Sequence, residues 1–159
     1  MAESNSSGFM VITTSNKSEA AVGYSTLYGD MVGGFAPLKD LNKTLVYSLA
    51  KWPNSRSYVI PTNVIERAPS AELAPNQKDS DSLPPYEILD EIHELYIEKD
   101  LTPTEISQRG FEKQIVERIA RLVDKSEYKR RQSAPGVRIT KRAFGRDRRF
   151  PITSKYSEL

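Results

Sequence analysis

The chain has 159 residues, of which 38% are hydrophobic and 28% are charged, a balance typical of one soluble globular domain. It has no cysteine and one histidine, His93, which excludes disulfides, zinc–thiolate sites and cysteine nucleophiles and leaves a Ser-His-Asp triad one candidate base. No apolar run approaches the roughly 18 residues of a membrane span, and the polar start lacks signal-peptide blocks, so we expect a cytoplasmic protein without membrane contact.

The first predicted element is a strand over residues 9–14. The run from Phe9 to Ile12 is apolar and is followed by two threonines, a composition typical of a buried parallel strand. We expect a polar turn next and a helix that begins near Asn16. Because a strand, a turn and a helix in this order form half of a nucleotide-binding unit, the sequence favours an α/β fold.

Three less regular elements follow. Residues 35–38 are a candidate edge strand, because Pro37 cannot donate to a ladder. Residues 41–52 are expected to be helical, since their apolar side chains recur at helical spacing. Residues 68–85 form a polar loop whose length indicates either a functional segment or disorder. For residues 76–85, a lid that orders over bound nucleotide and simple disorder both stay open.

Three helices are predicted in the second half. The first covers residues 86–99 and carries His93, for which we expect a position on the helix face without an acid–base partner. The second begins at Thr102, which forms a capping box with Glu105 and is followed by proline at the first helical position. The third runs from residue 112 to about 130 with one apolar stripe.

The last segment, residues 129–159, is basic and mostly irregular. Although the net charge of the chain is only +2, the span from Lys129 to Lys155 contains ten Lys or Arg and a single acid, Asp147. Such a tail needs solvent or an anionic partner, so nucleic-acid binding is one alternative function. The sequence contains no known nucleic-acid-binding signature, which disfavours that partner.

The first candidate site lies where the predicted strand passes into the first helix. Thr14 would stand at the carboxyl end of the strand, beside free helix amides. Glu19, in the first helical turn, would face the same crevice and could bind magnesium. The alternative is structural, because Asn16 and Glu19 also have the spacing of an ordinary capping box.

Five blocks in chain order resemble the NAD synthetase family, and specifically its long glutamine-dependent bacterial form. The first reads Thr-Thr-Ser-Asn-Lys-Ser-Glu at its start and continues through Tyr-Gly-Asp-Met-Val-Gly-Gly-Phe-Ala-Pro-Leu. The five blocks cover residues 13–40, 68–73, 81–86, 127–132 and 139–152. The resemblance implies a partial Rossmann-like domain of the adenine-nucleotide α-hydrolase type with a helical C-terminal part.

The family resemblance implies a carbon–nitrogen ligase of NAD biosynthesis. ATP activates the carboxylate of deamido-NAD as an adenylate, and ammonia from a glutaminase domain then displaces AMP to give NAD. Both steps gather negative charge, for which magnesium and cationic side chains are suited. The resemblance also implies a homo-oligomer.

The resemblance assigns the site residues of the family to individual positions of this sequence. Lys43, read without the resemblance, would be an ordinary solvated lysine. Leu27 stands where small relatives have a lysine, so that family contact does not transfer. The implied ATP-binding residues are Thr14, Lys43 and Ser70. The implied deamido-NAD-binding residues are Glu19, Tyr24, Ser25, Thr26, Leu27 and Lys129, with Glu19 also as the metal ligand.

Two parts of the family pattern are not in this sequence. They are the pyrophosphate loop Ser-Gly-Gly-x-Asp-Ser and the N-terminal glutaminase domain with its cysteine. We therefore expect residues 1–159 to be the C-terminal portion of a synthetase domain, inactive alone, with an exposed and association-prone sheet edge. A non-catalytic fragment that serves in subunit contacts is the remaining alternative.

Overall fold

The computed structural model describes residues 1–70 and 75–154. Residues 71–73 of the second family block and the tail end from Lys155 lie outside this description. The helices run along the chain as follows: α1 Ala2–Ser7, α2 Lys17–Val22, α3 Lys43–Asn54, α4 Thr62–Glu66, the 3-10 turn η1 Asp79–Asp81, α5 Tyr86–His93, the π-helical turn η2 Glu94–Glu98, α6 Pro103–Ser107, α7 Lys113–Lys125 and α8 Glu127–Arg130.

Two of the helices, α2 and α6, begin at the predicted capping residues. The side chain of Asn16 accepts a hydrogen bond from the backbone N–H of Glu19 at 3.0 Å, so α2 begins where expected. The predicted capping box at α6 is confirmed, with bonds between Thr102 and Glu105 in both directions and Pro103 at the first turn. The predicted helix 112–130 is divided at Ser126 into α7 and α8.

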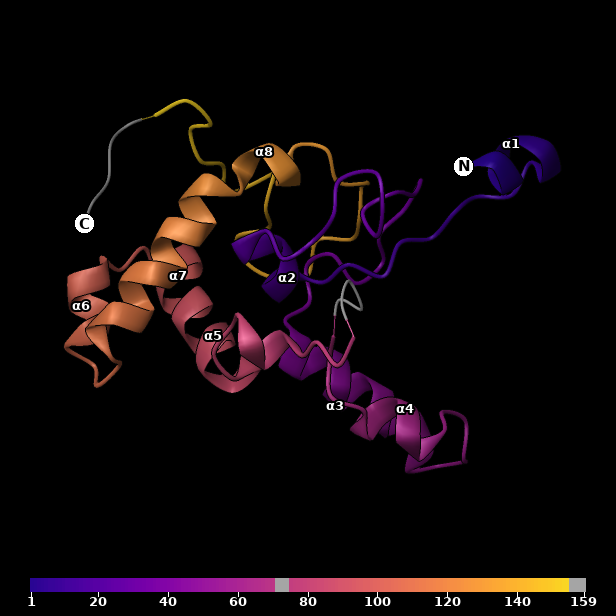
Figure 1. Ribbon diagram of the computed structural model, residues 1–159, viewed down its shortest axis with the longest axis horizontal. Coiled ribbons are helices and arrows are strands. Elements are labelled where there is room, and N and C mark those ends of the chain that lie inside the picture. The colour runs from indigo at the N-terminus through magenta and orange to yellow at the C-terminus, as the bar shows by residue number, and fades with distance from the viewer. Residues whose placement is uncertain (71–74, 155–159) are drawn as a thin grey trace.

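The hydrophobic core lies in the helical second half, with α2 packed against it. The predicted apolar faces of α5 and α7 are buried, as illustrated by Leu89 and Ile119. Phe144 and Phe150 of the C-terminal segment close the core from the other side. Figure 1 shows α5, α6 and α7 gathered into this body.

The prediction of a buried strand over residues 9–14 is wrong. Phe9 is 78% exposed, and Met10 and Ile12 are exposed as well. The backbone forms one parallel bridge, between Ile12 and Phe35, with the N–H of Thr13 donating to the Phe35 carbonyl at 2.9 Å. Apolar composition favours a strand, but a buried strand also needs neighbours on its edges and faces, which the described residues do not provide.

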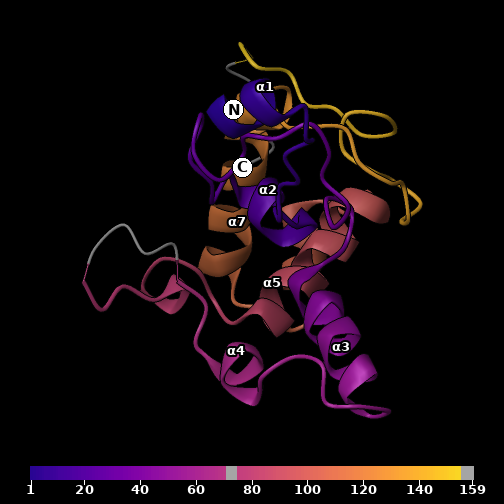
Figure 2. The same ribbon diagram turned by 90° about the vertical axis from the view of Figure 1, so that its right-hand side faces the viewer.

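The candidate edge strand at residues 35–38 is also corrected, since only Phe35 joins the bridge and a turn begins at Pro37. Among the described residues the expected α/β sheet is therefore reduced to two isolated bridges, Ile12 with Phe35 and Phe144 with Arg148. The helix α3 forms as predicted, but none of its residues is buried, and Trp52 is 58% exposed. Figures 1 and 2 show α3 and α4 side by side, extending from the body.

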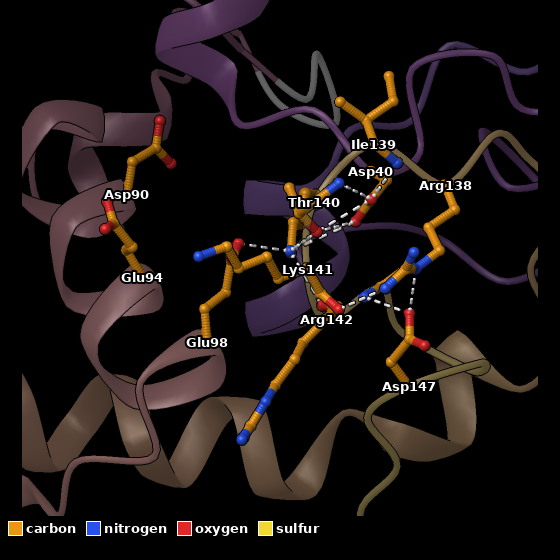
Figure 3. Close-up of polar contacts among 12 residues, drawn as sticks. Asp40, Asp90, Glu94, Glu98, Arg138, Ile139, Thr140, Lys141, Arg142 and Asp147 are labelled. Carbon is orange, nitrogen blue, oxygen red and sulfur yellow. Dashed lines mark hydrogen bonds and ion pairs between the residues drawn. The ribbon is translucent and has the colours of Figure 1, made fainter.

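A buried ionic cluster fixes the irregular C-terminal segment. Lys17 is 1% exposed, and its Nζ lies 3.0 Å from Glu98 and 3.3 Å from Asp40. The Asp40 carboxylate accepts the backbone N–H groups of Ile139 and Thr140 at 2.7 and 2.6 Å, as Figure 3 shows. This cluster therefore holds residues 139–142 against α2. Removing one of its charged partners would leave an uncompensated charge in the interior, which is costly.

None of the helices in the two described ranges combines the length and apolar character needed to cross a bilayer.

Candidate functional site

The first turn of α2 and the first turn of α3 meet through an ion pair. Glu19 does not complete the capping box with Asn16; its carboxylate instead lies 2.9 Å from the ammonium of Lys43. The same ammonium lies over the rings of Tyr47 and Tyr86, at 5.9 and 5.5 Å from their centres. Lys43 is therefore held by a carboxylate and two aromatic faces, and is not the freely solvated lysine of the alternative reading.

A large cavity opens beside this pair. Its volume is about 1160 Å³, and its walls come from α2 and residues 23–30, from the first turns of α3, from residues 60–70, from η1 and from α8. Eight of the nine site residues named from the sequence line it: Glu19, Tyr24, Ser25, Thr26, Leu27, Lys43, Ser70 and Lys129. Residues separated by more than a hundred positions are thus brought to one surface.

Lys129 reaches the cavity from α8 and is oriented by backbone. Its Nζ donates to the carbonyl oxygens of Gly23 and Ser25 at 2.6 and 2.7 Å. An ammonium has three donors, so these two bonds leave one for a ligand. The close approach of α8 to this turn depends on Gly23. This residue has φ +69°, and a Cβ at its position would overlap the Ser126 hydroxyl.

Thr14 does not line this cavity. It is exposed and lies between the bridge at Ile12 and the start of α2. Its buried neighbour Thr13 instead donates a hydrogen bond to the carbonyl of Asp30 at 2.8 Å. The predicted role of Thr14 in ATP binding stays a prediction.

Sequence reasoning missed Asp79, which lines the cavity from η1. Its carboxylate is buried and accepts a hydrogen bond from the Tyr86 hydroxyl at 2.6 Å. Burial and this bond raise the pKa of Tyr86 well above its usual range, and partial burial beside Asp79 raises the pKa of Tyr24. Both phenols are thus neutral hydrogen-bonding groups at working pH. No local pattern marks Asp79, because its partners come from other elements.

Part of the candidate lid is packed in this structure. The backbone N–H of Asp79 donates to the carbonyl of Pro69 at 2.9 Å, which links the start of the loop to its middle, and Leu83 belongs to the core. Simple disorder therefore does not describe residues 79–83. Movement of the segment over a bound nucleotide stays a prediction.

The carboxylates of the cavity offer a magnesium ion a partial site. The described residues contain no group of three His, Asp or Glu side chains placed to hold a metal. One oxygen of Glu19 pairs with Lys43, which leaves the other for a metal ion. Magnesium commonly takes one or two carboxylates together with phosphates and water, so Glu19 fits such an ion if phosphate supplies further ligands.

The cations of the basic tail are largely used inside the molecule. Arg138 pairs with Asp147 at 2.7 Å, and Arg142 and Arg148 both pair with Asp100. Arg130 is buried, pairs with Glu127, and stacks on Phe144 and Phe150. The tail therefore packs as a strap across the core, with several of its cations in intramolecular ion pairs.

Comparison with known proteins identifies a family that matches most of the chain. A family model described as NAD synthase matches residues 1–133. The chain belongs to the NAD synthase family. A glutamine-dependent NAD(+) synthetase of Acinetobacter baylyi is 59% identical over 156 residues, which is 97% of this chain and 29% of that protein. The chain thus spans under a third of the length of this relative.

Solved structures of the family share the fold. A glutamine-dependent NAD(+) synthetase from Cytophaga hutchinsonii superposes with a TM-score of 0.72 at 26% identity, over 95% of this chain and 25% of that one. An NMN synthetase from Francisella tularensis superposes with a TM-score of 0.62 at 27% identity, over 80% of this chain and 47% of that one. The fold of this chain is therefore shared with these two structures.

Proposed function

We propose that this chain forms the ligand-facing part of a glutamine-dependent NAD synthetase, a ligase that amidates deamido-NAD at the expense of ATP. The observation that carries the proposal is the cavity in which eight carried-over residues meet. A volume of about 1160 Å³ lies above the usual range for drug-sized ligands, so the cavity has room for a dinucleotide. Family membership supports the reaction class.

The chemistry would proceed in two displacements. A carboxylate oxygen of deamido-NAD attacks the α-phosphorus of ATP, forming the adenylate and releasing pyrophosphate. Ammonia then attacks the acyl carbon, the carbon–oxygen bond to AMP breaks, and the nitrogen loses a proton to give the amide. Glutamine, hydrolysed elsewhere in the whole protein, would supply the ammonia.

Each cavity residue has a role consistent with its contacts. The remaining donor of Lys129 would pair with the nicotinate carboxylate and select the acid over the amide. Lys43 would approach the phosphates of ATP, with Ser70 nearby as a further contact. Glu19 would hold magnesium, which supplies charge neutralisation for the phosphates when it is bound.

A segment exchange tests the proposal. The 156 matching residues of the Acinetobacter baylyi relative are replaced by this chain, and NAD formation is followed with glutamine and with ammonium salts. We expect amidation of deamido-NAD with both nitrogen sources. Activity with deamido-NMN in place of the dinucleotide would contradict the substrate assignment.

Lys129→Met in the exchanged protein addresses substrate binding. Loss of a charge-assisted hydrogen bond costs about 1.5–3 kcal/mol, so the KM for deamido-NAD should rise at least about tenfold while the KM for ATP changes little. Lys113→Met, an exposed lysine of α7, is the matched control. Equal effects of Lys129→Met on both substrates would refute its assigned role.

A non-catalytic role in subunit contact is the second candidate, and the exposed apolar side chains Leu45, Leu49 and Trp52 on α3 favour it. A stable homodimer of this chain without affinity for deamido-NAD, measured by sedimentation and titration calorimetry, would support that role over the first.

A further inference from the structure

The helix α3 begins without a cap of its own. The first turn of a helix has backbone N–H groups that no intrahelical carbonyl can satisfy. Asn42 stands at the N-cap position but makes no side-chain capping bond, and its Oδ1 is buried without a hydrogen-bond partner among the described residues. The start of α3 is therefore stabilised from outside the helix.

Two side chains from other helices supply the missing acceptors. The hydroxyl oxygen of Ser18, on α2, accepts the N–H of Lys43 at 2.8 Å. One carboxylate oxygen of Asp90, on α5, accepts both the N–H and the hydroxyl of Thr44, at 3.0 and 2.8 Å. Its other oxygen accepts the hydroxyl of Ser18. A carboxylate at a helix N-terminus is also favoured by the helix dipole.

Asp90 thus joins three helices through one buried group. It is 5% exposed, and both of its oxygens are occupied by hydroxyl or backbone donors of α2 and α3. Its contacts Ser18 and Thr44 are the chain neighbours of Glu19 and Lys43. The ion pair that faces the cavity therefore rests on bonds made one residue away.

We propose that Asp90 is a positioning residue of the site, which acts through Ser18 and the first turn of α3 to hold the Lys43 ammonium against Glu19. Its importance for catalysis rests on the proposed function, whereas its effect on Lys43 does not. Asp90 lines neither the main cavity nor the smaller one beside it, so it acts without touching the ligand.

The first test uses this chain and needs no ligand. Acetic anhydride at limiting dose acetylates lysines, and peptide mass spectrometry gives the rate at each position. In Asp90→Ala, we expect the acetylation rate of Lys43 to rise up to about fivefold relative to that of the exposed Lys51. This is the fold-change that corresponds to losing the free energy of a surface ion pair. Lys17, which is buried, should stay unmodified and so report that the fold is intact.

A matched control separates positioning from general loss of stability. Asp124, on α7, accepts a hydrogen bond from the Tyr96 hydroxyl at 2.9 Å and is also partly buried. Asp124→Asn should leave the ratio of Lys43 to Lys51 unchanged. If Asp90→Ala does not fold, Ser18→Ala removes one cap only and should raise the same ratio. An unchanged ratio in a folded Asp90 or Ser18 variant overturns the inference.

A second measurement links the inference to catalysis. In the segment-exchanged synthetase, Asp90→Asn should raise the KM for ATP several-fold while the KM for deamido-NAD and the glutaminase rate stay near the starting values. A rise in Lys43 acetylation without any change in ATP affinity would support Asp90 as a positioning residue and overturn the assignment of Lys43 to ATP.

Discussion

The helical body and the α3–α4 arm use their apolar residues in opposite ways. In the body, formed by α2 and α5 to α8, the apolar stripes meet one another, and Leu89 and Val116 have no exposed surface. On the arm, an equally regular stripe faces outward, and Leu45 and Leu49 are almost half exposed.

This contrast shows that periodicity specifies a helix, whereas burial depends on what packs against it. The apolar stripe of α3 and the segment from Phe9 to Ile12 have the patterns of buried elements, but the described residues leave most of these side chains exposed. The candidate site lies where the two regions meet, since α2 belongs to the body and α3 to the arm. Variants can therefore test whether body and arm differ in stability as they differ in burial.

The largest effect is expected at the ionic cluster that ties the C-terminal segment to the body. Lys17→Met leaves Asp40 and Glu98 without their buried cation, a change that costs about 3–5 kcal/mol. Urea denaturation measures it. Lys99→Met, which removes an exposed pair with Glu94, should cost under about 1 kcal/mol. Equal costs would show that the cluster is not a structural tie.

A matched pair of leucines compares the two regions directly. Leu89→Ala in the body should lower the free energy of unfolding by about 2–5 kcal/mol, because it leaves a cavity in a packed core. Leu49→Ala on the arm should cost much less, because the side chain is already half exposed. The two values come from the same denaturation assay, and similar losses would contradict the contrast.

The body should also respond to pH through His93. Burial, together with the charges of Lys17 and Arg130, lowers the pKa of His93 to about 3, and its ring nitrogens have no partner in the described residues. Between the unfolded pKa of 6.5 and the folded value, the unfolded chain binds the extra proton. Stability contributed by neutral His93 is thus complete above pH 6.5 and falls by about 1.4 kcal/mol per pH unit below it.

Denaturation at several pH values, compared with His93→Leu, isolates this contribution from that of the carboxylates. The variant should lose stability less steeply between pH 6.5 and 5, and at pH 7 it should be no less stable, because it removes two unsatisfied polar atoms. Parallel curves for the two proteins would exclude His93 as the titrating group.

The smallest change in stability is expected on the arm. The double variant Leu45→Glu and Leu49→Glu should alter the free energy of unfolding by less than about 0.5 kcal/mol per site, since both side chains face solvent. It should nevertheless reduce self-association at high protein concentration, measured by sedimentation velocity. Lys113→Glu on α7 is the control for charge alone, and association unaffected by the arm variant would place the contact elsewhere.

Local signals in the sequence predicted most of the helices, although not α1 or α4. Thr102 and Glu105 define a cap within four residues, and the apolar spacing of α7 is visible in a single window. The prediction of a strand at residues 9–14 failed because a strand needs a second segment to pair with, and only Phe35 pairs with this one. The resemblance named eight of the residues that line the cavity, although their roles remain proposals.

The missed groups share one property, which is that their partners are distant in the chain. Lys17 reads as a surface lysine until Glu98 and Asp40 surround it, and Asp90 reads as the polar side of a helix until Ser18 and Thr44 approach. His93 was expected on a helix face without an acid–base partner; its side chain is buried, and its ring nitrogens make no hydrogen bond within residues 1–70 and 75–154. Contacts of this kind become visible only once the chain is folded.

The close approach of Gly23 to Ser126 has a consequence for how the sequence can vary. The glycine has no side chain, the serine fills the space, and the ammonium three residues beyond it reaches the carbonyls on either side of the turn. A larger residue at either position would displace α8 and withdraw Lys129 from the cavity. In a family alignment, the residues at these two positions should therefore both stay small and should change together. The cause is the fixed distance between two positions that lie about a hundred residues apart in the chain.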